Sequence, residues 1–93
     1  MRLTKTEINS IKQLVSQFDD CAKVYLYGSR VDDSLKGGDI DLLIISPHFS
    51  FKDKLKIKSA LFYQLGEQRV DVLIAKEATT AFIQLILETA VVL

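Results

Sequence analysis

Apolar residues recur along the first part of the chain at spacings typical first of a helix and then of a strand. Thr4 and Glu7 stand at the spacing of a capping box, so a helix is predicted to begin after Thr4. Its apolar side chains recur every three or four residues and are Ile8, Ile11, Leu14, Val15 and Phe18. Residues 23–27 are β-branched or aromatic except for Lys23 and Leu26, and the run stops at Gly28, which predicts a strand.

The middle of the chain predicts a short helix followed by a buried strand. Ser29 is a good N-cap, so residues 30–35 are expected to form one or two helical turns, which the glycine pair 37–38 ends. Residues 39–46 are almost entirely apolar after Asp41. Such a run predicts a central strand that is covered on both faces.

A second long helix is predicted between Ser50, as its N-cap, and Gly66, at the usual C-terminal position. Four apolar side chains are expected to share one of its faces: Phe51, Leu55, Phe62 and Leu65. Its four lysines, at positions 52, 54, 56 and 58, divide into two rows at helical spacing. Most of these lysines are expected to form a solvated face.

The last third of the chain predicts one more strand and one more helix. Residues 69–75 alternate and are rich in valine, and Thr79 or Thr80 can cap a helix over residues 81–89, with residues 91–93 fraying or extending it. This helix is apolar on more than one face, so one face contacts a partner protein or both pack in the core. The order of elements predicts an α/β or α+β fold class, with a small mixed β-sheet of three or more strands packed against helices.

Length, composition and charge restrict the classes of protein to which the chain can belong. Its 93 residues are 48% apolar and 26% charged, which predicts a single folded domain over residues 1–93. Twelve basic residues balance twelve acidic ones, so no overall positive field attracts a polyanion, and direct nucleic-acid binding is not expected. The longest apolar stretch, residues 78–93, is interrupted and too short to cross a bilayer, so no membrane partner is expected.

The single cysteine and the N-terminus bear on the cellular compartment. Cys21 cannot form an internal disulfide, and no basic segment followed by an apolar one marks the N-terminus for export. A cytoplasmic location is therefore expected. The side chain of Cys21 is expected to be buried or half-buried, and the lone histidine, His48, is assigned no role.

Three aspartates stand where strands can bring them to one place. Asp39 and Asp41 are two residues apart, so in a strand both side chains project to the same face, with Cα atoms about 6.5 to 7 Å apart. Two carboxylates this close repel each other and resist burial unless a hard cation such as Mg²⁺ lies between them. Asp71 lies between two valines of the next strand, where an unpaired carboxylate is penalised, and is expected at the same metal.

A phosphate-binding turn is predicted beside these aspartates. Gly28 and Ser29 stand between a strand and a helix, where backbone N–H groups and a hydroxyl can hold a triphosphate. Arg30 either reaches the triphosphate or pairs with Asp32 or Asp33 on the surface. Three carboxylates around a metal, next to such a turn, favour phosphoryl or nucleotidyl transfer, although carboxylates at strand ends also occur without any catalytic role.

The stretch GSRVDDSLKGGDIDLLI, with Asp71 on a later strand, resembles the DNA polymerase beta nucleotidyltransferase superfamily. Nine residues separate Ser29 from Asp39, where the commonest form of the motif has ten. Within the superfamily the chain is similar to the minimal nucleotidyltransferases (MNT proteins) encoded beside HEPN-domain toxins. The resemblance implies a nucleotidyltransferase fold, Mg²⁺ ions (two are expected) held by catalytic Asp39, Asp41 and Asp71, and ATP held by Gly28 and Ser29.

The same resemblance implies an antitoxin that transfers AMP from ATP to a hydroxyl, expected to be that of a tyrosine, on a cognate HEPN toxin. A chain of 93 residues leaves no room for the accessory domains that hold acceptors in larger relatives, so the acceptor is expected to come with a partner protein. Two alternatives remain: an antitoxin that acts by binding through its last helix, and a transferase acting on a small molecule or an RNA end. Association of the chain with copies of itself, as a homo-oligomer, is a further possibility.

Overall fold

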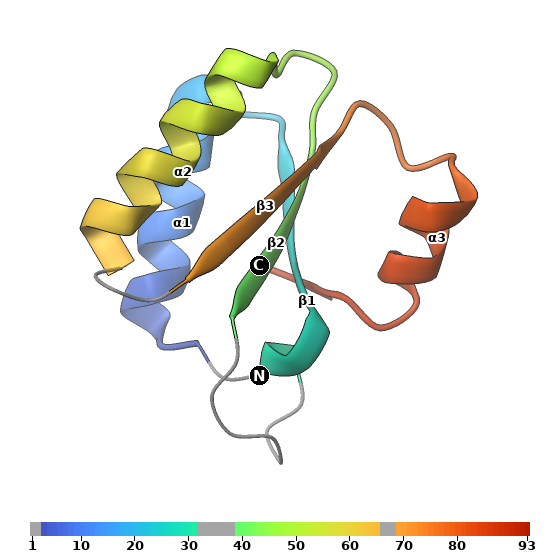
Figure 1. The fold of residues 1–93 in the computed structure, drawn as a ribbon, viewed down its shortest axis with the longest axis horizontal. Coiled ribbons are helices and arrows are strands. Elements are labelled where there is room, and N and C mark those ends of the chain that lie inside the picture. Colours follow the sequence, from blue (N-terminus) through green and yellow to red (C-terminus); the bar gives the residue numbers. More distant parts are fainter. Residues whose placement is uncertain (1–2, 32–38, 66–68) are drawn as a thin grey trace.

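A computed structural model describes residues 3–31, 39–65 and 69–93 of the chain (Figure 1). The helices, strands and 3₁₀ turn (η1) follow in this order: α1 (Lys5–Phe18), β1 (Lys23–Tyr27), η1 (Gly28–Val31), β2 (Ile40–Ile45), α2 (Phe51–Leu65), β3 (Val70–Ala75), α3 (Ala81–Leu87) and β4 (Val91–Val92). The glycine pair 37–38, the rest of the helix predicted over residues 30–35, and Gly66 lie outside the described residues.

The predicted capping box begins α1. The Thr4 hydroxyl accepts a hydrogen bond from the Glu7 backbone N–H (3.1 Å), and the Glu7 carboxylate accepts one from the Thr4 backbone N–H (2.9 Å). Two of the donors that a helix N-terminus leaves unpaired are satisfied in this way. The buried face of α1 carries Ile11, Leu14 and Val15, which confirms the predicted amphipathic helix.

The strands form one mixed sheet in the order β3-β2-β1-β4. β1 pairs antiparallel with β2 and β4, and β2 pairs parallel with β3. The predicted mixed sheet packed against helices is therefore confirmed. β4 was not predicted: residues 91–93 neither fray nor extend α3, because the β-branched Val91 and Val92 pair with the otherwise free edge of β1 and the Leu93 N–H donates to Val24 O (2.9 Å).

β2 lies between β1 and β3, as its apolar sequence predicts. Ile40, Leu42 and Ile44 are completely buried in the core that α1 and α2 form with one face of the sheet (Figure 1). Leu43, which projects to the opposite face, is completely buried as well. The strand is thus covered on both faces, and its first residues hold the candidate carboxylates in a fixed frame.

The buried face of α2 differs from the predicted one. Phe51, Leu55 and Phe62 are 73%, 50% and 58% exposed, and the buried residues are Ile57, Leu61 and Leu65. Leu65 belongs to both the predicted and the observed set. However, α2 packs against α1 and β3 through the residues that follow one another every four positions, at 57, 61 and 65. The N-cap prediction is confirmed, because the Ser50 hydroxyl accepts a hydrogen bond from the Asp53 N–H (3.3 Å).

The last helix is short and only partly covered. Thr80 caps α3 by accepting a hydrogen bond from the Ile83 N–H (3.3 Å), and Ile83 is buried while Phe82 and Leu85 are more than 60% exposed. Within the described ranges, no helix combines the length and apolarity needed to span a membrane. The expectation for Cys21 is wrong: its side chain is exposed, because it lies in the turn between α1 and β1.

Candidate functional site

The register of three strands places Tyr27, Asp41 and Asp71 in one row across the sheet. Tyr27 of β1 is the partner of Asp41 in β2, and Asp41 is the partner of Asp71 in β3. Register partners on adjacent strands, about 4.8 Å apart, project to the same face of a sheet. The neighbouring Leu42 belongs to the helix-covered core, so this row lies on the opposite face.

Gly28 follows β1 directly and lies against Asp41. Its φ of +79° falls in the left-handed region, which residues with a side chain rarely adopt. A Cβ atom added to Gly28 would lie 3.3 Å from Asp41 Cγ and would overlap Asp41 Oδ2. The backbone turn at the end of β1 and the first carboxylate of β2 therefore fit together only because residue 28 is glycine.

The carboxylates of the site affect one another electrostatically. Desolvation by partial burial raises the pKa of Asp41, and the charges of Asp71 and Asp39 raise it further. Asp39, directly before β2, is half-buried, and Asp71 is exposed. Gly28 and Asp71 thus lie beside Asp41, and Asp39 is close enough to raise its pKa, although Asp39 precedes the strand instead of belonging to it. The site concentrates negative charge, which a cation would neutralise.

Two residues of this neighbourhood were not identified from the sequence. Tyr27 is half-buried, and its pKa is raised by desolvation and then by the charges of Asp41 and Asp71. Lys58 of α2 lies with Nζ 3.9 Å from Asp71 Oδ1, whereas the sequence placed it among solvated lysines. Pairing the two predicted strands on either side of Gly28 would have found Tyr27, but no local signal indicates the contact of Lys58.

The chemistry of the donor set fits Mg²⁺, which prefers carboxylate oxygens and water as ligands. Among the described residues, however, no three carboxylate, imidazole or thiol groups are arranged so that they could hold one ion together. Metal binding by all three aspartates therefore stays a prediction. The side chains of Ser29 and Arg30 lie outside the described part of the chain, so their predicted contacts with a triphosphate stay predictions.

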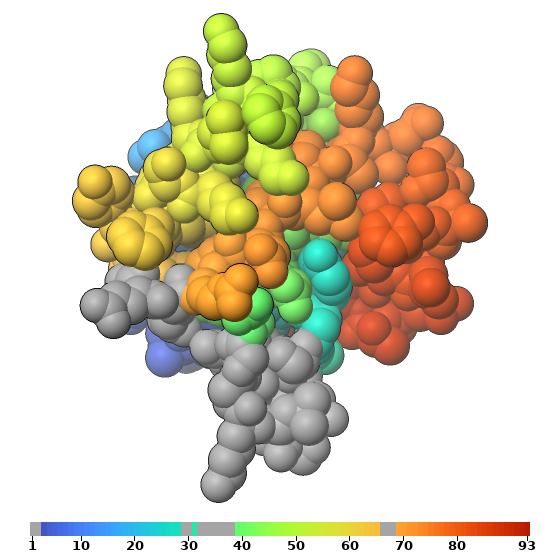
Figure 2. All heavy atoms as spheres, viewed as in Figure 1, coloured from blue at the N-terminus to red at the C-terminus, as the bar shows by residue number. Residues whose placement is uncertain are grey.

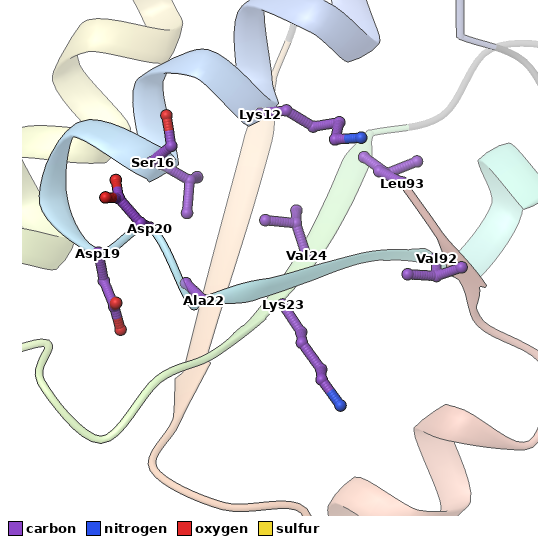
Figure 3. A pocket seen from close by; sticks show the side chains of 10 residues that line it. Lys12, Ser16, Asp19, Asp20, Ala22, Lys23, Val24, Val92 and Leu93 are labelled. Carbon is purple, nitrogen blue, oxygen red and sulfur yellow. The ribbon is translucent and has the colours of Figure 1, made fainter.

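A separate hollow lies at the other end of β1 (Figure 3). It is bordered by α1, the start of β1 and the C-terminal residues, among them Lys12, Asp20, Lys23 and Val92. Lys23 begins β1 and Tyr27 ends it, so about 13 Å of strand separates this hollow from the aspartates. The hollow is therefore distinct from the candidate site.

The carboxylate of Asp19 next to this hollow has a structural role. It accepts hydrogen bonds from the buried Ser46 hydroxyl and from the Cys21 N–H (3.0 Å), and these bonds, the Ser46 bond first, lower its pKa. These contacts join the end of α1 to the end of β2. Asp19 is thus accounted for by the fold.

The family model described as polymerase beta, nucleotidyltransferase matches residues 9–93, a range that includes Gly28 and all three aspartates. No curated protein matches the chain.

Proposed function

Because the chain belongs to the polymerase beta nucleotidyltransferase family, we propose that it transfers AMP from ATP to a tyrosine hydroxyl of a HEPN-domain toxin and so acts as an antitoxin. The observation that carries the catalytic part of this proposal is the close packing of Gly28 against Asp41, with Asp71 beside it in register. We place the reaction in the cytoplasm, where ATP is available. The HEPN partner is supported by the likeness of the motif to MNT proteins.

Each residue of the site has a distinct part in the proposed reaction. Asp39 and Asp41 would hold Mg²⁺, with Asp71 as a further ligand, and the ion would supply neutralisation of charge on the triphosphate and on the leaving group. Backbone N–H groups at Gly28 and Ser29 hold the phosphates, and Arg30 pairs with them. Asp71 is the most exposed of the three aspartates and accepts the proton of the incoming hydroxyl.

The covalent step is an in-line displacement at the α-phosphorus of ATP. The acceptor oxygen forms a bond to this phosphorus while the bond to the bridging oxygen of the β-phosphate breaks, and pyrophosphate leaves with the bonding electrons. The proton of the hydroxyl passes to the Asp71 carboxylate. AMP is then linked to the acceptor through a phosphodiester bond.

Replacing Asp41 by asparagine tests the catalytic proposal. Asp41→Asn keeps the shape of the side chain but removes its charge, so incorporation of label from α-labelled ATP into the toxin should fall at least a hundredfold. Asp20→Asn is the matched control, because Asp20 is exposed and borders the separate hollow. Transfer by Asp41→Asn at the unmodified rate, with Mg²⁺ present, would contradict the proposal.

A second function is favoured by one observation, the exposed apolar residues Phe82 and Leu85 of α3. In that case the chain neutralises the toxin by binding through this helix, without chemistry. An Asp41→Asn variant that transfers no AMP but still neutralises the toxin would show that the chain neutralises it by binding. Label that appears in RNA instead of protein would decide for a nucleic-acid acceptor.

A further inference from the structure

The outer side of α2 exposes an unusual number of large apolar side chains. Phe51, Leu55, Phe62 and Tyr63 are between 50% and 86% exposed, and Figure 2 shows the side chains of α2 standing out beside the start of β3. Two hollows lie along this side. The first is lined by Leu55, Lys58, Ser59, Phe62 and Tyr63, and the second includes Phe51, Lys54, Leu73 and Lys76. We name the surface formed by these two hollows the α2–β3 face.

The α2–β3 face combines apolar groups with positive charge. Each hollow contains lysine, Lys58 in the first and Lys54 and Lys76 in the second, and none of the described lining residues is acidic. The nearby Asp53 is engaged at the start of α2, where its carboxylate accepts hydrogen bonds from Ser50. A surface of this kind complements a partner that presents acidic and apolar side chains together.

The chemistry of the α2–β3 face favours a protein over a nucleic acid. Beside the rings of Phe51, Phe62 and Tyr63, the hollows are lined by aliphatic side chains, those of Leu55, Leu73 and Ile74, which suit the apolar side chains of a protein and not the flat face of a base. The chain as a whole has no net charge, so no overall field attracts a polyanion. Apolar hollows with a few lysines are better suited to an amphipathic, acidic segment of a protein.

The α2–β3 face is continuous with the candidate site. Lys58 lines the first hollow and also lies 3.9 Å from Asp71, the carboxylate to which we assign the proton of the acceptor. A protein segment seated in this hollow would be within the length of one lysine side chain of the reacting groups. We propose that the α2–β3 face is the docking site of the acceptor protein, which it recognises through an acidic, apolar segment; this inference rests on the proposed function.

Introducing negative charge at two of the apolar positions tests the docking site. The double variant Leu55→Glu/Phe62→Glu should raise the KM for a HEPN-domain toxin used as acceptor at least tenfold, with kcat and ATP binding by the chain alone changed less than twofold. The control outside both candidate binding surfaces is Val92→Glu, which introduces the same charge at an exposed apolar position of β4 and should keep the KM for the toxin within twofold. Phe82→Glu/Leu85→Glu makes the change on α3, the surface of the alternative function, and should also keep this KM within twofold if the α2–β3 face is the docking site.

Lys54→Glu/Lys76→Glu tests the charge of the second hollow separately. If the partner segment is acidic, this pair should also raise the KM, and the increase should shrink at high salt. Unfolding midpoints of the Leu55/Phe62 variants should agree with that of the unmodified chain, because both side chains are at least half exposed. Lys54 is half-buried and Lys76 is exposed, so Lys76→Glu alone replaces the lysine pair if that pair lowers the unfolding midpoint. If Leu55→Glu/Phe62→Glu fails to fold, the milder Leu55→Ser/Phe62→Ser pair replaces it, with the same expected direction.

The outcomes separate the docking site from the proposed function. If the unmodified chain and Leu55→Glu/Phe62→Glu label the toxin with the same KM, the docking site is overturned and the proposed function is still supported. Loss of labelling confined to the α3 pair would overturn it as well. No labelling by the unmodified chain would overturn both. Binding of a 20-nucleotide single-stranded RNA that is lost in the α2 pair would show a nucleic-acid surface and overturn the protein acceptor.

Discussion

At the scale of single residues, Gly28 and Asp41 depend on each other. Gly28 adopts a left-handed conformation at the end of β1, and the absence of a Cβ leaves the space that the Asp41 carboxylate fills. The backbone can then approach the carboxylate closely, and the proposed phosphate contact of the adjacent N–H groups needs the same freedom from a side chain. One glycine therefore serves the turn and the site together.

Replacement of Gly28 by alanine should damage both stability and activity. The left-handed conformation costs a residue with a Cβ about 1 to 2 kcal/mol, and the added methyl group forces the Asp41 carboxylate to move. We expect a loss of stability of this size in urea denaturation and a loss of AMP transfer of at least tenfold. Gly28→Asn separates the two effects, because asparagine tolerates this conformation but still carries a Cβ. Full activity in both variants would show that Asp41 need not stay in place.

The charge of Asp41 should cost the fold some stability. Its pKa is raised in the folded chain by desolvation and by Asp71 and Asp39, so the ionised carboxylate destabilises the fold at pH values above this raised pKa. Asp41→Asn should therefore raise the unfolding midpoint at neutral pH, and this advantage should shrink as the pH falls through the folded pKa of Asp41. A gain of 1 kcal/mol corresponds to roughly 4 to 8 °C in a domain of this size. Calorimetry in metal-free buffer measures it, and an advantage that grows toward low pH would contradict the assigned cause.

At the scale of helices and strands, elements with local signals were predictable from the sequence and pairings between distant segments were not. The capping box of α1 and the continuous apolar run of β2 act within a few residues, and both predictions are confirmed. The buried face of α2 depends on which of its side chains pack against α1 and β3. The helical pattern alone therefore did not identify Ile57 and Leu61 as buried. β4 exists only because β1 offers it an edge.

The candidate site shows the same division. The motif around Gly28 and the two aspartates of the DID sequence identified the residues of the candidate site, because their spacing is fixed along the chain. Tyr27 and Lys58 approach Asp41 and Asp71 through strand register and helix packing, which join residues far apart in sequence. Sequence reasoning therefore found the groups that carry charge, and the fold added the residues that surround them.

At the scale of the whole molecule, the mixed sheet has two edges with different protection. β3 forms one edge, beside α2, and the short β4 covers β1 at the other. An uncovered strand edge presents unpaired N–H and C=O groups that can pair with another chain. The two residues of β4 and Leu93 are few, but they pair with backbone groups of β1 that would otherwise form an uncovered edge.

Removal of residues 91–93 should expose the edge of β1 and alter the behaviour of the whole chain. The truncated chain loses the pairing of β4 with β1 and the Leu93 N–H bond to Val24 O, together with the core contact of the Leu93 side chain. We expect a loss of about 1 to 3 kcal/mol in denaturation, within the ordinary range for such lesions, and concentration-dependent self-association in analytical ultracentrifugation. Val92→Lys is the control, because Val92 is 64% exposed and the substitution keeps every backbone bond. If the truncated chain has unchanged stability and sediments like this control, pairing with β4 is not needed to protect the edge of β1.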